Sequence, residues 1–189
     1  DQNTLVIFTS DNGPYDGSVH EVEFFDSNGP LQGVKRQVYE GGIRVPLIVR
    51  WPGVGESGTT CKVPVSSLDF YPTLLAAAGL EPDRKRPLDG ENLTPLLSGR
   101  GSLQRQEIFF HYPNYAFHRS NRLGGAVRAG DYKLIRFYDD DSVELYNLAE
   151  DIGETRDLAE RLPGKAAELK NKLEAWLEET NANMPRRRP

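Results

Sequence analysis

One stretch near the start of the chain decides the fold: Thr4-Leu5-Val6-Ile7-Phe8-Thr9-Ser10-Asp11-Asn12-Gly13-Pro14. Its first six residues are apolar or β-branched, which is typical of a buried strand, and the next five have the composition of a tight turn. Asp11 and Asn12 therefore stand at the carboxyl end of a strand. In open α/β sheets ligands bind at that edge, so these two side chains are candidates for a polar site.

A polar loop and a second apolar strand follow. Residues 31–46 read Leu-Gln-Gly-Val-Lys-Arg-Gln-Val-Tyr-Glu-Gly-Gly-Ile-Arg-Val-Pro, and the apolar run covers residues 45–51. Neither apolar segment, 4–9 or 45–51, alternates with polar residues, which favours strands inside a parallel sheet with helices on both faces. We expect an α/β fold whose neighbouring strands lie outside these 189 residues.

The order and spacing of these phrases resemble the C-terminal half of the formylglycine-dependent sulfatases, the arylsulfatase family. The resemblance rests on S-D-N-G at 10–13, L-x-G-x-K at 31–35 and E-G-G-x-R-V-P at 40–46, with further matches at 67–75, 89–93, 130–134 and 144–148. It implies an alkaline-phosphatase-like α/β fold. Residues 1–101 would be the C-terminal part of the large parallel-sheet domain. Residues 102–189 would form a small subdomain with an antiparallel sheet and a packed C-terminal helix.

The resemblance assigns roles to three residues. Asp11 and Asn12 carry hard oxygen donors and would supply part of the shell of one calcium ion, and Lys35 would neutralise charge on the sulfate as the ester bond breaks. Calcium takes about six to eight oxygens, so an aspartate pair and the formylglycine nucleophile would come from an N-terminal half. In related phosphatases a zinc-binding histidine usually stands at position 12. Asn12 therefore favours a sulfatase.

The formylglycine sequence needs Cys or Ser, then Pro two residues on and Arg two beyond that, and these 189 residues contain no such motif. We therefore expect the 189 residues alone to be inactive and to need an N-terminal half as partner. The only cysteine, Cys61, departs from the motif and is expected to be a packing residue. Gln32 and Arg36 also depart from the family, which often has arginine and glycine at these positions, and both lie at the substrate edge of the implied pocket.

Histidines are the candidates for substrate contacts. Residues 111–119 read His-Tyr-Pro-Asn-Tyr-Ala-Phe-His-Arg, which are groups able to stack on a sugar or aromatic ring and to donate to its hydroxyls. The resemblance implies that this subdomain contributes to the substrate pocket, so His111 and His118 are candidates, with His20 as a weaker one. Each could equally be a structural histidine bonded to the backbone.

Local patterns predict the remaining elements. Asp69 is expected to cap a helix that buries Leu74, Leu75 and Ala78 and ends at Gly79. Short strands are expected at 107–112, 126–129, 133–138 and 142–146, and a short helix at 154–160. A longer helix opens at Pro163 and carries an apolar stripe at helical spacing that should cover the small sheet: Ala166, Leu169, Leu173, Trp176 and Leu177.

Composition limits the class of protein and its partners. The chain is 38% hydrophobic and 27% charged, which is ordinary for a globular protein. Its net charge of −5 gives no general attraction for nucleic acid, so an anionic substrate must be drawn by local cations such as Lys35, Arg36 and Arg44. No apolar run approaches the roughly 18 residues of a membrane span.

Several functions fit the sequence, and the sulfatase reading leads them. It implies a sulfated small molecule or glycan as substrate and a periplasmic, secreted or lysosomal location. A phosphodiesterase or phosphonate hydrolase of the same superfamily, and a non-catalytic truncated or degenerate module, remain as alternatives.

Overall fold

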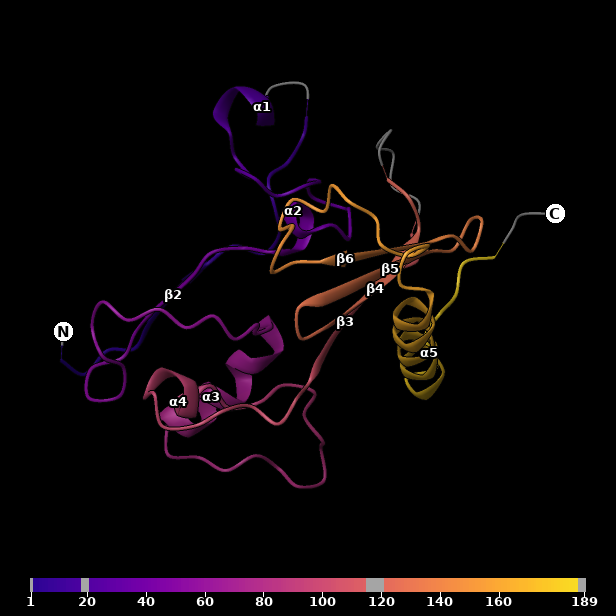
Figure 1. Ribbon diagram of the computed structural model, residues 1–189. Coiled ribbons are helices and arrows are strands. Elements are labelled where there is room, and N and C mark those ends of the chain that lie inside the picture. The colour runs from indigo at the N-terminus through magenta and orange to yellow at the C-terminus, as the bar shows by residue number, and fades with distance from the viewer. Residues whose placement is uncertain (1, 18–20, 115–120, 187–189) are drawn as a thin grey trace. The chain divides into compact units, whose positions relative to one another are not determined.

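The computed structural model describes residues 2–17, 21–114 and 121–186 (Figure 1). Its residues group into two compact units, one of residues 1–9 and 46–108 and the other of residues 10–45 and 109–189. The domain boundary that the sequence predicts after residue 101 stays a prediction. None of the helices in the described residues has the length and apolar character needed to cross a membrane.

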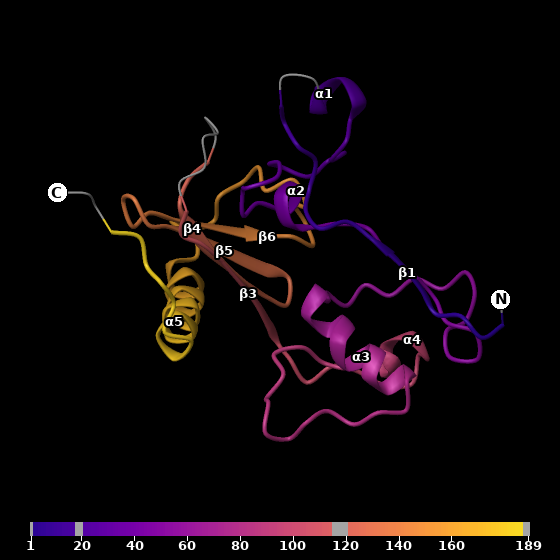
Figure 2. The same cartoon turned by 180° about the vertical axis from the view of Figure 1, so that it is seen from behind.

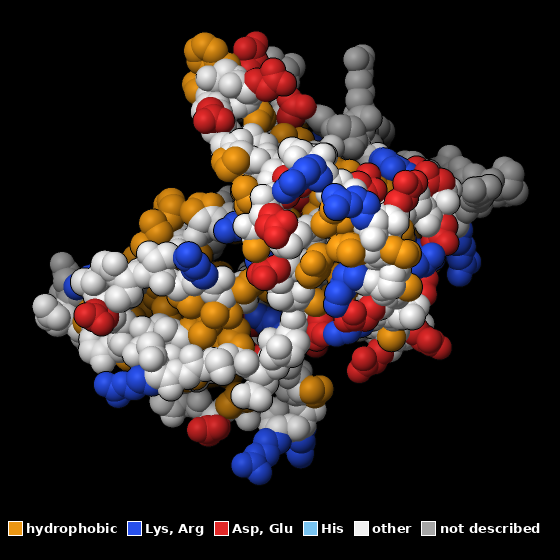
Figure 3. Space-filling model, viewed as in Figure 1, with side chains coloured by type: hydrophobic (Ala, Val, Ile, Leu, Met, Phe, Trp, Pro, Cys, Tyr) orange, Lys and Arg blue, Asp and Glu red, His pale blue; other side chains and the backbone are white. Residues whose placement is uncertain are grey.

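The first unit contains two short strands. β1 (Val6–Thr9) pairs with β2 (Leu47–Arg50) in antiparallel register, with Val6 opposite Arg50. This differs from the parallel arrangement expected for these segments, because an apolar run indicates burial on both faces but not the direction of pairing. Phe8 is 60% exposed and Ile48 is 64% exposed. In Figure 3 hydrophobic side chains lie open to solvent on the part of the molecule that holds these strands.

The first unit also holds the predicted helix, which begins earlier than expected. Ser66 caps a 3₁₀ turn (Ser67–Asp69) that leads directly into α3 (Phe70–Ala77), and α4 (Thr94–Leu97) follows. The Ser66 hydroxyl accepts from the amide of Leu68, and the Asp69 carboxylate accepts from the amide of Ser66. Asp69 is thus the third residue of a capping box, and its side chain points back along the chain.

The buried face of α3 is not the predicted one. Thr73 is buried, whereas Leu74 is 48% exposed and Ala78 is exposed. The Thr73 hydroxyl donates to the carbonyl of Asp69 and accepts from the amide of Leu93, so hydrogen bonds turn this side of the helix inward. The predicted end is confirmed, because Gly79 follows the helix at a φ of 69°.

The second unit is built on the four-stranded sheet that the sequence predicts. Its strands are β3 (Glu107–Tyr112), β4 (Gly124–Ala129), β5 (Tyr132–Phe137) and β6 (Val143–Asn147), in that order across the sheet. β4 pairs with β5 and β5 with β6 in antiparallel register. All four lie within two residues of the predicted bounds.

α5 (Pro163–Glu179) covers one face of this sheet, as Figure 2 shows from behind. The predicted stripe is confirmed. The Trp176 ring stacks on Phe109 with centroids 5.0 Å apart. The buried cluster joins three strand residues to four helix residues: Val127, Leu134, Leu145, Ala166, Leu169, Leu173 and Leu177.

The opposite face of the sheet receives the segment that leads into α2 (Glu40–Ile43). Val38 is buried there, and Tyr39 packs against the same cluster, whose sheet residues include Ala126, Ile135 and Phe137. A further short helix, α1 (Val22–Phe25), precedes this segment. Residues 38–43 are therefore held against the sheet, which matters because they belong to the family phrase E-G-G.

The predicted helix at 154–160 is absent. Glu154 has a φ of 53°, in the left-handed region, and the segment forms turns. The Asp151 carboxylate accepts from the amides of Thr155 and Arg156, and the Asp157 carboxylate accepts from two further amides. Aspartates that bond nearby backbone compete with helix formation, and here they prevail.

Candidate functional site

The site begins with the turn that follows β1. The Ser10 hydroxyl donates to the carbonyl of Asn12 (2.9 Å), and the Asn12 side-chain amide donates to the carbonyl of Gly13 (3.0 Å). This bond uses one of the donors of the Asn12 amide and leaves its side-chain oxygen, the acceptor, outside the bond. Asp11 is exposed beside it.

Gly13 fastens this turn to α2. Its amide donates to the carbonyl of Gly42 (3.0 Å). A Cβ at position 13 would collide with the carbonyl of Gly41, so only glycine permits this approach. The phrases S-D-N-G and E-G-G therefore meet through their backbones.

The loop that carries Lys35 joins the same assembly. The Lys35 amide donates to the carbonyl of Pro14 (2.9 Å), and the Gly41 amide donates to the carbonyl of Gln32 (2.6 Å). A Cβ at Gly41 would collide with this loop as well. The structure thus brings together the turn that contains Asp11 and Asn12, the loop that contains Lys35, and α2, while the roles of those side chains stay predictions.

A buried ion cluster, made of Glu40, Lys133 and Glu154, lies beneath α2. The Lys133 ammonium on β5 is 3.0 Å from a Glu40 oxygen and 2.8 Å from a Glu154 oxygen. The Glu40 amide also donates to the Glu154 carboxylate (2.7 Å). The exposed fraction of all three residues is 3% or less. Sequence reasoning missed this cluster, although a lysine in the apolar strand 132–137 is a signal for a buried partner.

The two carboxylates of the ion cluster differ in pKa. Burial raises the pKa of Glu40, but Lys133, with Arg128 and Arg44 beyond it, outweighs burial and holds that pKa below its usual value. Burial also raises the pKa of Glu154, and Lys133 offsets it only in part, so this pKa lies above its usual value. Of the two carboxyls, Glu40 is the one whose ionised form its cationic neighbours favour over burial.

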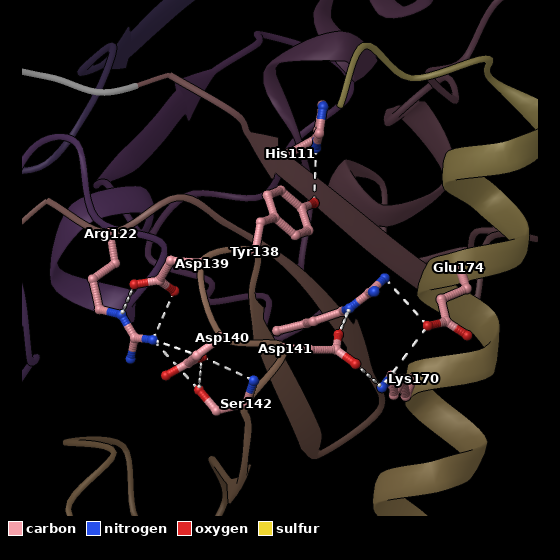
Figure 4. Close-up of polar contacts among 10 residues, drawn as sticks. His111, Arg122, Tyr138, Asp139, Asp140, Asp141, Ser142, Lys170 and Glu174 are labelled. Carbon is pink, nitrogen blue, oxygen red and sulfur yellow. Dashed lines mark hydrogen bonds and ion pairs between the residues drawn. The ribbon is translucent and has the colours of Figure 1, made fainter. Parts of the chain in front are cut away.

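The structure accounts for both ring nitrogens of His111. Nδ1 lies 2.8 Å from the Tyr138 hydroxyl (Figure 4), and Nε2 lies 3.3 Å from the carbonyl of Asn183. A carbonyl only accepts, so Nε2 donates, and in the neutral ring Nδ1 accepts from Tyr138. Burial raises the pKa of Tyr138 to about 12, which keeps its hydroxyl protonated as the donor. These contacts favour the structural role for His111. His118 and His20 lie outside the described residues.

Three other sequence predictions concern single residues. Cys61 is exposed, so the prediction that it packs is wrong. Gln32, with its amide nitrogen turned toward the neighbouring loop, donates to the carbonyl of Glu154 (2.6 Å), which ties the Lys35 loop to the ion cluster. Arg36 has a φ of 80°, a region that favours glycine, and its guanidinium lies over the ring of Tyr15 at 5.3 Å from the centroid.

Comparison with known proteins identifies these phrases. A family profile described as "N-sulphoglucosamine sulphohydrolase, C-terminal" matches residues 32–183, which include Lys35, α2 and the small sheet. The chain belongs to the sulfatase family. A protein named "Sulfatase" from Formosa agariphila is 38% identical to it over 96% of the chain. That alignment covers 34% of the relative, so the chain spans about a third of its length.

Solved structures agree with the sulfatase fold. Ps i-CgsB, in complex with k-i-k-neocarrahexaose, superposes with a TM-score of 0.75 and 29% identity over 93% of this chain and 36% of that one. BT4656, in complex with its substrate D-glucosamine-2-N,6-O-disulfate, superposes with a TM-score of 0.73 and 30% sequence identity, over 97% of this chain and 36% of that one. A phosphonate monoester hydrolase from Silicibacter pomeroyi superposes with a TM-score of 0.56 and 28% sequence identity, over 79% of this chain and 31% of that one. The alkaline-phosphatase-like fold expected from the sequence is thereby confirmed.

Asp69, in the sulfatase phrase at 67–75, forms a buried ion pair in the first unit. The Arg105 guanidinium donates two bonds of 2.7 Å to the buried carboxylate of Asp69. The amide of Glu91 donates to the same carboxylate (2.8 Å). Burial raises the pKa of Asp69, but the guanidinium and the backbone donors outweigh it and lower that pKa. The phrases at 67–75 and 89–93 are thus joined through the carboxylate of Asp69.

The donor set of this sulfatase chain fits part of a calcium site. Asp11 offers a carboxylate and Asn12 an amide oxygen, both preferred by hard cations. Within residues 2–17, 21–114 and 121–186, no group of three or more His, Cys, Asp or Glu residues is placed to hold a metal ion. The two residues can therefore contribute to a shell but cannot complete it.

Proposed function

We propose that the chain is the C-terminal part of an enzyme that hydrolyses sulfate esters. The observation that carries this proposal is a pair of backbone bonds, Gly13 to Gly42 and Lys35 to Pro14. They hold the proposed metal turn (residues 10–14) and the lysine loop (residues 31–35) within one unit. Membership of the sulfatase family supports the same activity. Because the chain spans about a third of its relative, the activity belongs to the whole protein.

In this proposal Asp11 and Asn12 bind a calcium ion together with oxygen ligands from outside residues 1–189. The ion, when bound, would polarise the sulfate oxygens, and a formylglycine outside these residues would be the nucleophile. Lys35 would donate to a sulfate oxygen and stabilise the charge that develops as the ester bond breaks. Its amide bond to Pro14 holds the base of this side chain beside the metal turn.

We further propose that the first unit docks onto the polypeptide that supplies those missing groups. Val6, Phe8 and Ile48 are each exposed by more than two fifths, which is costly for apolar side chains on neighbouring strands. The larger size of the relatives gives room for such a covering segment. A sulfated glycan or small molecule is the proposed substrate, and a periplasmic, secreted or lysosomal compartment the proposed location.

The test is a panel of aryl sulfates, phosphates and phosphonates assayed with the full-length protein. We expect turnover of the sulfates, a loss of about 10²–10³ in kcat for Lys35→Ala, and no turnover by residues 1–189 alone. Lys85→Ala, in an exposed loop, is the matched control and should keep full activity. Preferential turnover of phosphonates would instead favour the phosphonate hydrolase alternative, to which the Silicibacter pomeroyi similarity points. Absence of any turnover would favour a non-catalytic module.

A further inference from the structure

Arg36 is a cation beside Lys35 that the proposed reaction does not use. Its φ of 80° lies in the left-handed region, which side chains larger than glycine rarely adopt. Residues held in such conformations persist where the surrounding structure imposes them, and they gather at ligand sites. The Lys35 amide bond to Pro14 and the close packing of Gly41 on the same loop supply that constraint.

The guanidinium of Arg36 rests on an aromatic ring instead of an acid. Its central carbon lies 5.3 Å from the centroid of the Tyr15 ring, and Tyr15 is 45% exposed. Among the described residues no carboxylate forms an ion pair with Arg36. Other arginines of the second unit do pair, as Arg122 does with Asp139 at 2.8 Å and Arg136 with Asp141 at 2.6 Å. Contact with the ring leaves the N–H groups of the guanidinium able to bind an anion.

The position of this pair relates it to the proposed reaction. Tyr15 directly follows Pro14, whose carbonyl accepts from the Lys35 amide, so the ring and the two cations stand on two hydrogen-bonded loop segments. Consecutive Cα atoms are about 3.8 Å apart, so the side chains of Lys35 and Arg36 leave the backbone of one loop at neighbouring points. The exposed ring adds a surface on which a sugar can stack.

We propose that Arg36, held by Tyr15, binds a second anionic group of the substrate, a sulfate or carboxylate beside the ester that is cleaved. The substrate class is then a saccharide with at least two anionic groups. This inference rests on the proposed function, because it takes Lys35 as the residue that meets the scissile sulfate. A guanidinium suits this task since its fork donates two parallel bonds to a sulfate or carboxylate.

The test compares monosulfated and disulfated forms of the same monosaccharide with the full-length protein. Wild type should prefer the disulfated form in kcat/KM, and Arg36→Gly should reduce that preference about ten- to a hundredfold. Arg36→Lys, which keeps the charge but not the fork, should lose part of it. Arg84→Gly, in the exposed loop of the other unit, is the matched control and should keep the preference. Arg36→Gly should not lower the unfolding midpoint, because glycine accepts a φ of 80°.

Three outcomes would overturn the inference: a wild type without preference, an unchanged preference in Arg36→Gly, or an equal loss on both substrates, which would place Arg36 at the scissile sulfate. Calorimetric binding of the same two sugars separates this inference from the proposed function. If no ester is turned over, the proposed function fails, and tighter binding of the disulfated sugar to wild type than to Arg36→Gly would still support the anion site. Equal binding to both proteins would refute it.

Discussion

Replacing Lys133 by methionine should destabilise the second unit in a strongly pH-dependent way. The substitution keeps most of the apolar stem but removes the ammonium that lies within 3.0 Å of both Glu40 and Glu154. Removing one partner of a buried ion pair costs about 3–5 kcal/mol, because it leaves buried charge uncompensated. The alternative is to protonate one carboxyl. From an unfolded pKa of about 4.3, that costs about 3.7 kcal/mol at pH 7 and about 1 kcal/mol at pH 5.

The sign of the pH dependence follows from proton binding. Without Lys133 the folded protein takes up a proton that the unfolded chain releases above pH of about 4.3, so the pKa of a buried carboxyl is raised in the folded state. Stability of the variant then falls as pH rises. We expect its deficit relative to wild type to be about 4 kcal/mol at pH 7 and about 1 kcal/mol at pH 5. Adding Glu154→Gln should recover a large part of the loss at pH 7, since Glu40 keeps Arg44 and Arg128 nearby.

Hydrogen exchange measured by mass spectrometry is the suitable assay, because peptides from β4, β5 and α5 report the opening of this unit alone. Lys165→Met serves as control. Its ammonium makes an exposed pair with Glu168 at 2.6 Å, and such pairs contribute about 0–1 kcal/mol. A Lys133→Met protein that loses less than about 1 kcal/mol, or loses the same amount at pH 5 and pH 7, would refute the view that the ion cluster holds these elements together.

Three further predictions address other parts of the chain. Asp69→Asn should lower the free energy of unfolding of the first unit by about 3 kcal/mol at pH 7. Because the pKa of Asp69 is lowered in the folded state, wild type should lose this stabilisation as pH falls below about 4. Unfolding measured against pH should therefore show a weaker loss of stability in acid for the variant than for wild type. Gly42→Ala places a Cβ against two backbone carbonyls and should reduce both stability and activity, whereas Gly164→Ala has open space at the start of α5 and should be neutral or stabilising in thermal unfolding. Asp11→Ala should weaken calcium binding in titration calorimetry of the full-length protein and abolish any calcium-dependent turnover; equal affinity in variant and wild type would remove Asp11 from the metal site.

Local patterns predicted the small sheet and its helix well, for a physical reason. β3 to β6 are short runs separated by tight connections, and each pairs with its neighbour in sequence, so local signals are sufficient. The apolar stripe of α5 needs only helical spacing to be recognised. The helix predicted at 154–160 is absent because the carboxylates of Asp151 and Asp157 accept from amides of that segment, which residue propensities do not register.

The candidate site likewise has parts that the sequence could locate and parts that only the folded structure shows. The order of the family phrases located the turn at 10–14 and the loop at 31–35, and the structure joins them. The ion cluster was missed because Glu40, Lys133 and Glu154 are far apart in sequence and only folding reveals that they share one buried space. Likewise, the sequence around His111 does not indicate that its two ring nitrogens bond the Tyr138 hydroxyl and a backbone carbonyl.

The ion cluster and the proposed site are linked through a continuous series of contacts. Lys133 pairs with Glu40, the first residue of α2, and the next two residues are the glycines that bond the turn at 10–14 and the loop at 31–35 through their backbones. Gln32 extends the link from that loop to the backbone of Glu154. A shift of the cluster would therefore move Asn12 and Lys35 together, and misplacement of catalytic groups by about 1 Å can cost about 10² in rate. Lys133 should accordingly act on turnover as a positioning residue, with its effect on activity following the same pH dependence as its effect on stability.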